Sequence, residues 1–278
     1  MHELVQYLLQ PFVIRALISA VLTSTIAAMI GSFMVFRGLS FMASGVAHAA
    51  LGGAALGLFL QVIGLSWFDP ILGALLFGVL VAVVTGYVGE RGIASKMEVA
   101  IGVTFAFAMS IAVLFMTVLP AEHLPRIWGL LVGDILLLTN TDILILLVSS
   151  IIVSLITMLF FKEFIYISFD IEGASAHGMN VRLYNYLLLI LMAISIIVAV
   201  KSVGAILVYT VMVIPAAAAS EIGESIHKII VLIFVIAFLS QFIGIIASYY
   251  LSTSPSAIAG IISSTIYMIV IVKRRVKG

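Results

Sequence analysis

Ser40–Gly57 holds the residues of this chain whose types and spacing best suit chemistry. Ser40, Ser44, His48 and Gly52 recur every four residues, so one helix face would carry two hydroxyls and an imidazole. A neutral imidazole can offer a nitrogen lone pair to a metal ion. It could equally hydrogen-bond across a helix contact, and a single histidine is not a metal site. A second, symmetry-related copy of His48 would make it one.

A second series in the same segment consists of small residues. Gly45, Ala49, Gly53 and Gly57 also recur at four-residue spacing. In membrane helices this small-xxx-small pattern lets two backbones approach closely. We therefore expect a tightly packed helix here, with His48 beside its packing face.

The composition indicates which kind of helix this is. Apolar residues make up 64% of the 278 positions and charged residues 9%, with a mean hydropathy of +1.35. Soluble domains average about 45–50% apolar and about 25% charged residues. Since a membrane span needs about 20 apolar residues, the chain has room for eight to ten spans. The absence of cysteine excludes disulfides and thiolate metal sites.

Polar interruptions divide the sequence into nine apolar stretches. All are expected to be helices, because an open strand in lipid would leave backbone groups unpaired. The weakest division lies at Lys201–Gly204, where we expect two short helices to meet at a turn. The stretches are 12–36, 40–62, 70–88, 98–118, 141–161, 184–201, 203–219, 228–250 and 255–272.

The basic residues predict the orientation of these spans. Lys and Arg accumulate in cytoplasmic loops, and with nine spans ten of the thirteen fall on the side of the 273–277 tail. We therefore expect a single transmembrane domain, residues 1–278, with the N-terminus outside and the C-terminus in the cytoplasm.

Several functions are excluded by absent motifs. The sequence contains no G-x-x-x-x-G-K-[ST] loop for nucleotide phosphates, no H-E-x-x-H helix and no G-x-S-x-G elbow. It also lacks a basic, aromatic-rich patch for nucleic acid. The chain is therefore not expected to be an enzyme or to bind a cofactor, and ATP-driven transport would need a separate ATPase.

Several segments together resemble the zinc/manganese/iron ABC permease family, whose fold is similar to the type II importers of vitamin B12 and siderophores. Their order and spacing agree along nearly the whole chain. They are Gly31-Ser32-Phe33-Met34-Val35-Phe36-Arg37, Ser40-Phe41, Val46-Ala47-His48-Ala49, Ala100-Ile101-Gly102-Val103, Gly133-Asp134, Val203-Gly204-Ala205-Ile206-Leu207 and Ile214-Pro215-Ala216-Ala217-Ala218.

The resemblance implies an all-α permease in a bacterial or archaeal cell membrane that carries divalent zinc, manganese or iron. It implies a homodimer, two ATPase subunits and an extracytoplasmic metal-binding protein, which would dock at loops around 67–69 and 122–133. The family usually carries Asp four residues before the histidine, so His48 and Ser44 would be the metal-facing pair here. Ser44 replaces a carboxylate with one neutral oxygen, which leaves the choice of metal open.

The resemblance also implies that a cytoplasmic loop docks the ATPase, and two loops are candidates. The favoured loop follows the seventh span and includes Pro215, Ala216, Ala218, Ser220, Glu221, Gly223 and Glu224. The competing loop includes Asp170, Ala174 and Gly178. Either segment could instead be a solvated connector.

Two other functions remain open. Ser44 would suit the wider, less ligating path of a permease for a metal chelate such as a siderophore or cobalamin. A secondary transporter driven by protons or sodium is less favoured, since such proteins usually place carboxylates or broken helices at mid-membrane.

Overall fold

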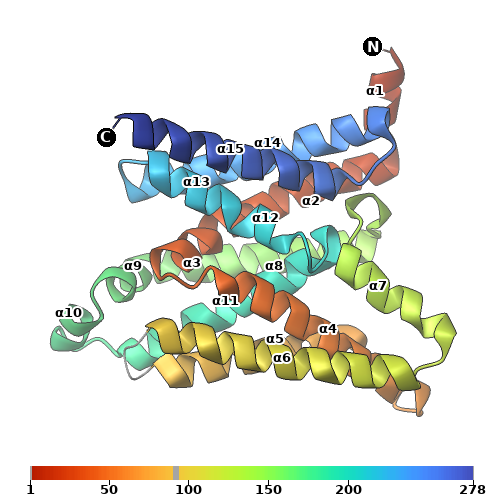
Figure 1. Ribbon diagram of the computed structural model, residues 1–278, viewed down its shortest axis with the longest axis horizontal. Helices are drawn as coiled ribbons and strands as arrows, with labels where there is room; N and C mark the ends of the chain where they lie inside the picture. The colour runs from red at the N-terminus through yellow and green to blue at the C-terminus, as the bar shows by residue number, and fades with distance from the viewer. Residues whose placement is uncertain (1, 90–93, 278) are drawn as a thin grey trace.

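The computed structural model describes residues 2–89 and 94–277, and within these ranges all regular structure is helical. Eight helices of the described residues are long and apolar enough to cross a bilayer. They lie side by side along the long axis of the molecule (Figure 1). The expected all-α membrane bundle is confirmed.

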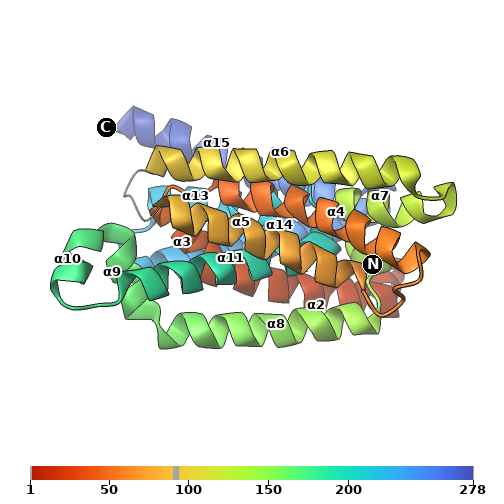
Figure 2. The same ribbon diagram turned by 90° about the horizontal axis from the view of Figure 1, so that it is seen from below.

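The long helices are α2 (Pro11–Ile26), continued through the π-helical turn η1 (Ala27–Gly31) into α3 (Ser32–Phe36), then α4 (Phe41–Val62), α5 (Pro70–Gly89), α6 (Ala94–Val118), α8 (Asn140–Leu159), α11 (Val181–Val203), α14 (Ile226–Leu251) and α15 (Pro255–Lys277). Successive long helices alternate in direction except α11 and α14, which run the same way because the short helices between them return the chain to the other end (Figures 1 and 2).

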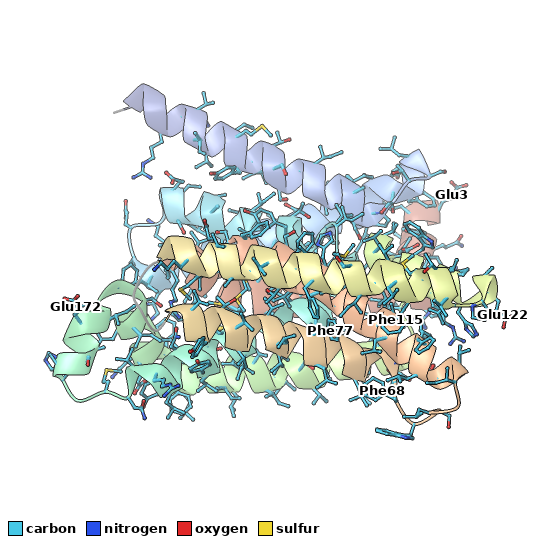
Figure 3. The ribbon with its side chains drawn as sticks, turned by 60° about the horizontal axis from the view of Figure 1, so that its bottom comes forward. Glu3, Phe68, Phe77, Phe115, Glu122 and Glu172 are labelled. Carbon is cyan, nitrogen blue, oxygen red and sulfur yellow. The ribbon has the colours of Figure 1, made fainter. Side chains whose placement is uncertain are left out.

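Shorter helices lie at the two ends of the bundle. Helix α1 (His2–Leu8), η2 (Ala121–His123), α7 (Leu124–Val132) and η3 (Ile135–Leu137) lie at one end, and α9 (Phe161–Phe169) and α10 (Ile171–Ala176) lie at the other. The two termini lie at opposite ends. Glu3 and Glu122 mark the end with the N-terminus, and Glu172 on α10 marks the end with the C-terminus (Figure 3).

The seventh expected span, 203–219, is not a full-length helix. It consists of α12 (Val208–Met212) and α13 (Ile214–Ile222), with Pro215 near the start of α13. Residues 208–222 would reach roughly 22 Å even as one continuous helix, short of the ~30 Å hydrocarbon core. Nine full-length spans are therefore not confirmed: the described residues form eight, plus this short pair.

The expected break near Lys201 occurs, but α11 is not short. Helix α11 runs unbroken for 23 residues and ends at Gly204, which has a φ of +86°. The segment after it is held by the outer helix α7, because the backbone N–H groups of Ala205 and Ile206 donate to the carbonyls of Leu130 (3.1 Å) and Leu131 (3.2 Å).

Helix α4 lies in the middle of the bundle, packed against α5, α6 and α11. The small residues face two different neighbours. A Cβ added to Gly53 would overlap the carbonyl of Gly73 on α5, whereas one added to Gly45 would overlap Ile101 on α6. Gly52, which the sequence placed on the histidine stripe, also packs on α6, against the backbone of Ala108. Glycines therefore bring two helices close to α4 at once.

The first and seventh long segments, α2 and α14, are joined by buried hydrogen bonds. The Gln241 side chain donates to Ser24 Oγ (3.0 Å), and its carbonyl oxygen accepts from Thr23 Oγ1 (3.1 Å). All three side chains are buried, so each needs its polar partner inside the bundle.

Candidate functional site

The partly exposed stripe of α4 carries the predicted metal-facing pair. Between Met42 and Leu58 every residue of α4 is buried except Ser44, His48 and Leu56, which are half-buried. These positions are four and eight residues apart, so they share one face of the helix. The pair therefore lies at the surface of this single chain rather than in its core.

The hydrogen bonds of His48 fix which ring nitrogen is free. Nδ1 lies 2.9 Å from the backbone carbonyl oxygen of Ser44. Because a carbonyl oxygen only accepts, Nδ1 carries the proton and Nε2 keeps its lone pair. The ring makes a T-shaped contact with Phe105 on α6, with centroids 5.3 Å apart. These contacts orient the His48 imidazole and leave Nε2 as the nitrogen available to a ligand.

The pair does not make a complete metal site by itself. Within 2–89 and 94–277, no group of three or more His, Asp or Glu side chains could hold a metal ion together. Ser44 Oγ lies 3.5 Å from Nδ1, at the outer limit of a hydrogen bond. Further ligands would have to come from outside this chain, and a second copy could supply another His48 and Ser44.

The favoured ATPase-docking loop is largely buried. Pro215, Ala216 and Ala218 lie inside the bundle, where the alanines form an apolar cluster with residues of η1 and α14. The Ser220 hydroxyl donates to the Ala216 carbonyl at 2.8 Å. Three residues predicted to touch an ATPase are therefore core residues, because their small side chains let α13 pack closely on its neighbours.

The polar part of this loop is engaged in ion pairs. Glu221 pairs with Arg274 on α15, and Glu224 pairs with Lys228 at 3.0 Å. Gly223 ends α13 with its backbone N–H bonded to the Ala219 carbonyl at 2.8 Å. These contacts tie the end of α13 to α14 and α15, and Ile222 is its exposed apolar residue.

The competing loop projects from the end of the molecule. Helices α9 and α10 extend beyond the bundle at the end that carries the C-terminus (Figures 1 and 2). Ala174 is fully buried, the Asp170 carboxylate accepts from the Gly173 N–H at 2.8 Å, and Gly178 has a φ of +77°. Helix α10 is therefore anchored by its buried alanine and its capped first turn. Phe169 at the end of α9 and Ile171 at the start of α10 are exposed. The sequence analysis missed these two, although apolar residues flanking a polar cap could have indicated them.

Arg37 lies just beyond α3 at the same end. Burial lowers the pKa of its guanidinium to about 10, so it stays charged at neutral pH. One of its terminal nitrogens is buried and has no hydrogen-bond partner. The folded chain therefore holds a poorly solvated cation near the base of α9.

The opposite end presents exposed aromatic and polar side chains. Trp67, in the loop between α4 and α5, is 73% exposed, and the Glu122 carboxylate lies 3.5 Å from His123 Nε2. An ion pair that the sequence analysis missed joins Lys201 of α11 to Asp142 of α8 at 2.5 Å. Asp142 also forms a capping box with Thr139 at the start of α8.

Sequence comparison decides the family. The profile of the ABC 3 transport family matches residues 9–274. The chain belongs to this family. The family member MntC of Listeria monocytogenes, a manganese transport system membrane protein, is 30% identical over 269 residues, covering 97% of this chain and 92% of MntC. The manganese import system permease ScaB of Streptococcus gordonii is 30% identical, covering 93% of this chain and 90% of ScaB.

Solved structures agree with this ABC 3 assignment. A chain of PsaBC from Streptococcus pneumoniae, solved in complex with Fab, superposes with a TM-score of 0.83 at 28% identity, covering 97% of this chain and 94% of that one. An inward-facing ABC transporter of the metal-chelate type gives a TM-score of 0.73 at 16% identity, over 94% of this chain and 85% of that one. The second likeness concerns the fold alone. The chain is thus a multi-pass membrane transport subunit.

Proposed function

We propose that this chain is the permease subunit of an ATP-driven importer of divalent metal ions, with manganese as the principal cargo. The observation that carries the proposal is similarity over nearly the whole chain to permeases named for manganese transport. Zinc and iron, which the sequence left open beside manganese, become the secondary candidates.

The metal path would form between two copies of the chain. A homodimer that met at the half-buried face of α4 would bring together two His48 imidazoles and two Ser44 hydroxyls. A neutral serine hydroxyl binds a divalent ion more weakly than a carboxylate does, since it brings no compensating charge. A weak site suits the transit of an ion better than its storage.

The two ends of the bundle would serve different partners. The end with α9, α10 and the basic C-terminal helix would lie in the cytoplasm, since basic residues accumulate there. Two ATPase subunits would dock at α10, where Phe169 and Ile171 are exposed, rather than at the buried 215–218 segment. An extracytoplasmic metal-binding protein would dock at the other end, near Trp67 and Glu122.

A second cargo class is favoured by one relative. The chelated iron transport system membrane protein YfeD of Yersinia pestis is 27% identical over 96% of this chain. A path lined by Ser44 instead of a carboxylate would also pass an ion that arrives with its own ligands. Competition by free metal against chelated metal separates the two cargoes.

The decisive experiment reconstitutes the chain with its ATPase and binding protein in proteoliposomes. We expect ATP-dependent accumulation of Mn²⁺ that exceeds accumulation of Zn²⁺ or Fe²⁺. Uptake that continues without ATP or without the ATPase would overturn the importer assignment. Uptake only of a metal chelate would keep the ABC machinery and replace the cargo.

A further inference from the structure

A cleft of about 270 Å³ lies between α5 and α8, with α11 as its floor. Helix α11 packs against both α5 and α8 and lies between them (Figure 2). Each helix contributes residues at helical spacing, so the cleft runs along the bundle axis. The lining residues used below are Asp142, Ile145 and Ser149 of α8, and Ile194, Val198 and Lys201 of α11.

The cleft opens on the outer surface of the bundle. Ile145 of α8, which lines the cleft, is 36% exposed, and Val148 nearby on α8 is 47% exposed. In a membrane protein such a face meets lipid. An apolar cavity of only about 150 Å³ is already large enough to bind benzene. Hydrocarbon from the bilayer therefore has both access to this cleft and room within it.

The cleft ends at charged groups. Lys201 and Asp142 line it at the end of the bundle that carries the N-terminus, and they also line a more open hollow of about 360 Å³. That hollow is bordered by Arg126 and Asp134 as well. An apolar cleft that ends in a polar, open hollow matches the two parts of an amphiphile.

The four charged side chains that border the hollow, Arg126, Lys201, Asp134 and Asp142, sum to no net charge, but Arg126 is not ion-paired within the described residues. The Asp142 carboxylate already accepts from Lys201 (2.5 Å) and from the Thr139 backbone N–H (3.0 Å), and Asp134 accepts from the Leu136 N–H (2.9 Å). The side chain of Lys201 remains 39% exposed. A phosphate group would therefore have Arg126 as its main partner, with the exposed part of the Lys201 side chain as a second contact.

We propose that this cleft binds one acyl chain of a phospholipid, whose phosphate contacts Arg126 and Lys201. Seven residues separate Ile194 from Lys201, which corresponds to roughly 10 Å along the helix and accommodates part of one acyl chain. Guanidinium and ammonium groups are the usual protein partners of phosphate.

A second copy of the chain would not cover the cleft. Ala50 lines its base from α4 and lies two residues after His48, which places it about 200° around the helix. A dimer that formed at the His48 face would therefore leave the cleft facing lipid. The lipid site does not depend on which metal the protein carries.

Photolabelling of the full-length chain in phosphatidylcholine vesicles tests the proposal. The probe is phosphatidylglycerol with a diazirine midway along one acyl chain, and adducts are located by peptide mass spectrometry. We expect adducts concentrated at residues 145–149 and 194–198. Ser149→Trp, which fills the cleft, should reduce the adducts on α11 to background. Val148→Trp, which adds the same ring on the exposed face of α8, should leave them unchanged.

The phosphate contact has its own controls. Arg126→Gln should reduce labelling several-fold, whereas Lys96→Gln, at the other end of the bundle, should not. A diacylglycerol carrying the same diazirine should label the cleft several-fold less than the phospholipid. The proposal is overturned by adducts spread evenly over the exposed face of α8, by equal labelling of the two tryptophan variants, or by equal labelling with both probes. The adduct map of the unmodified chain decides the site even where a variant fails to fold.

Discussion

Gly133 and Gly204 cross with their backbones in contact, so that a Cβ added to either residue would overlap the chain of the other. Both have positive φ angles, +64° and +86°. The crossing joins the end of α7 to the start of the broken segment after α11. The end of α7 is thereby connected directly to the segment that leads into the α12–α13 pair.

Replacing Gly204 with alanine should destabilise the protein strongly. The new side chain would meet the backbone of Val132 and would also disfavour the φ of +86°. Backbone strain of this kind costs about 1–3 kcal/mol, and the overlap adds to it. Thermal unfolding of the purified chain measures the effect. Gly38→Ala is the matched control, since Gly38 has a φ of +66° but nothing within 4 Å of its Cβ position. Equal losses in the two variants would mean that the crossing contact contributes nothing.

Replacing His48 with alanine should abolish most metal transport. The substitution removes the Nε2 lone pair that the Ser44 carbonyl leaves available, and we expect at least about a tenfold loss of Mn²⁺ uptake. Uptake in proteoliposomes containing the ATPase measures this. Leu56→Ala tests the same half-buried face without a ligand and should retain uptake. Undiminished uptake by His48→Ala, with assembly intact, would remove His48 from the path.

The two candidate docking loops can be separated by a matched pair of substitutions. Ile171 at the start of α10 and Ile222 at the end of α13 are 47% and 46% exposed. An aspartate buried in an apolar contact is costly, so Ile171→Asp should prevent the ATPase from co-purifying with the permease. Ile222→Asp should leave the complex intact. The reverse outcome would restore the 215–224 loop as the main docking surface.

Replacing Arg37 with methionine should stabilise the isolated chain. Burial lowers the pKa of the guanidinium to about 10, so the folded state binds this proton less tightly than the unfolded state. The charged group therefore opposes folding at every pH below about 10. Arg37→Met should raise the unfolding temperature, with a gain on the order of 1–3 kcal/mol. A lower unfolding temperature would mean that the Arg37 side chain stabilises the isolated chain, and it would contradict the prediction.

The sequence predicted the fold where local patterns were sufficient. Apolar length predicted the eight long spans, and the four-residue spacing of Gly53 and Gly57 predicted close packing. The pattern could not show that Gly45 and Gly52 face α6 while Gly53 faces α5, because spacing along one helix does not identify its neighbours. The sequence separated the 203–219 stretch from α11, but its mostly apolar residues did not show that it forms the two short helices α12 and α13.

The candidate site, like the fold, was predictable from the sequence only in part. The stripe of Ser44 and His48 followed from helical spacing, whereas the free nitrogen of His48 depends on a backbone contact that only coordinates reveal. The burial of Pro215, Ala216 and Ala218 was not evident, since small residues suit both a surface groove and a packed core. The ion pair of Lys201 with Asp142 joins residues far apart in the chain, so no local pattern contained it.

The hydrogen bonds of Gln241 to Thr23 and Ser24 have a consequence for biosynthesis. Helix α2 is among the first segments to leave the ribosome, but its buried polar partner is made more than two hundred residues later. Until α14 is inserted, these hydroxyls face other helices, lipid or the insertion machinery. A chain truncated before residue 241 would lack these hydrogen bonds. Thr23 and Ser24 of its α2 would lack the Gln241 partner, and we expect membrane quality control to recognise such a helix.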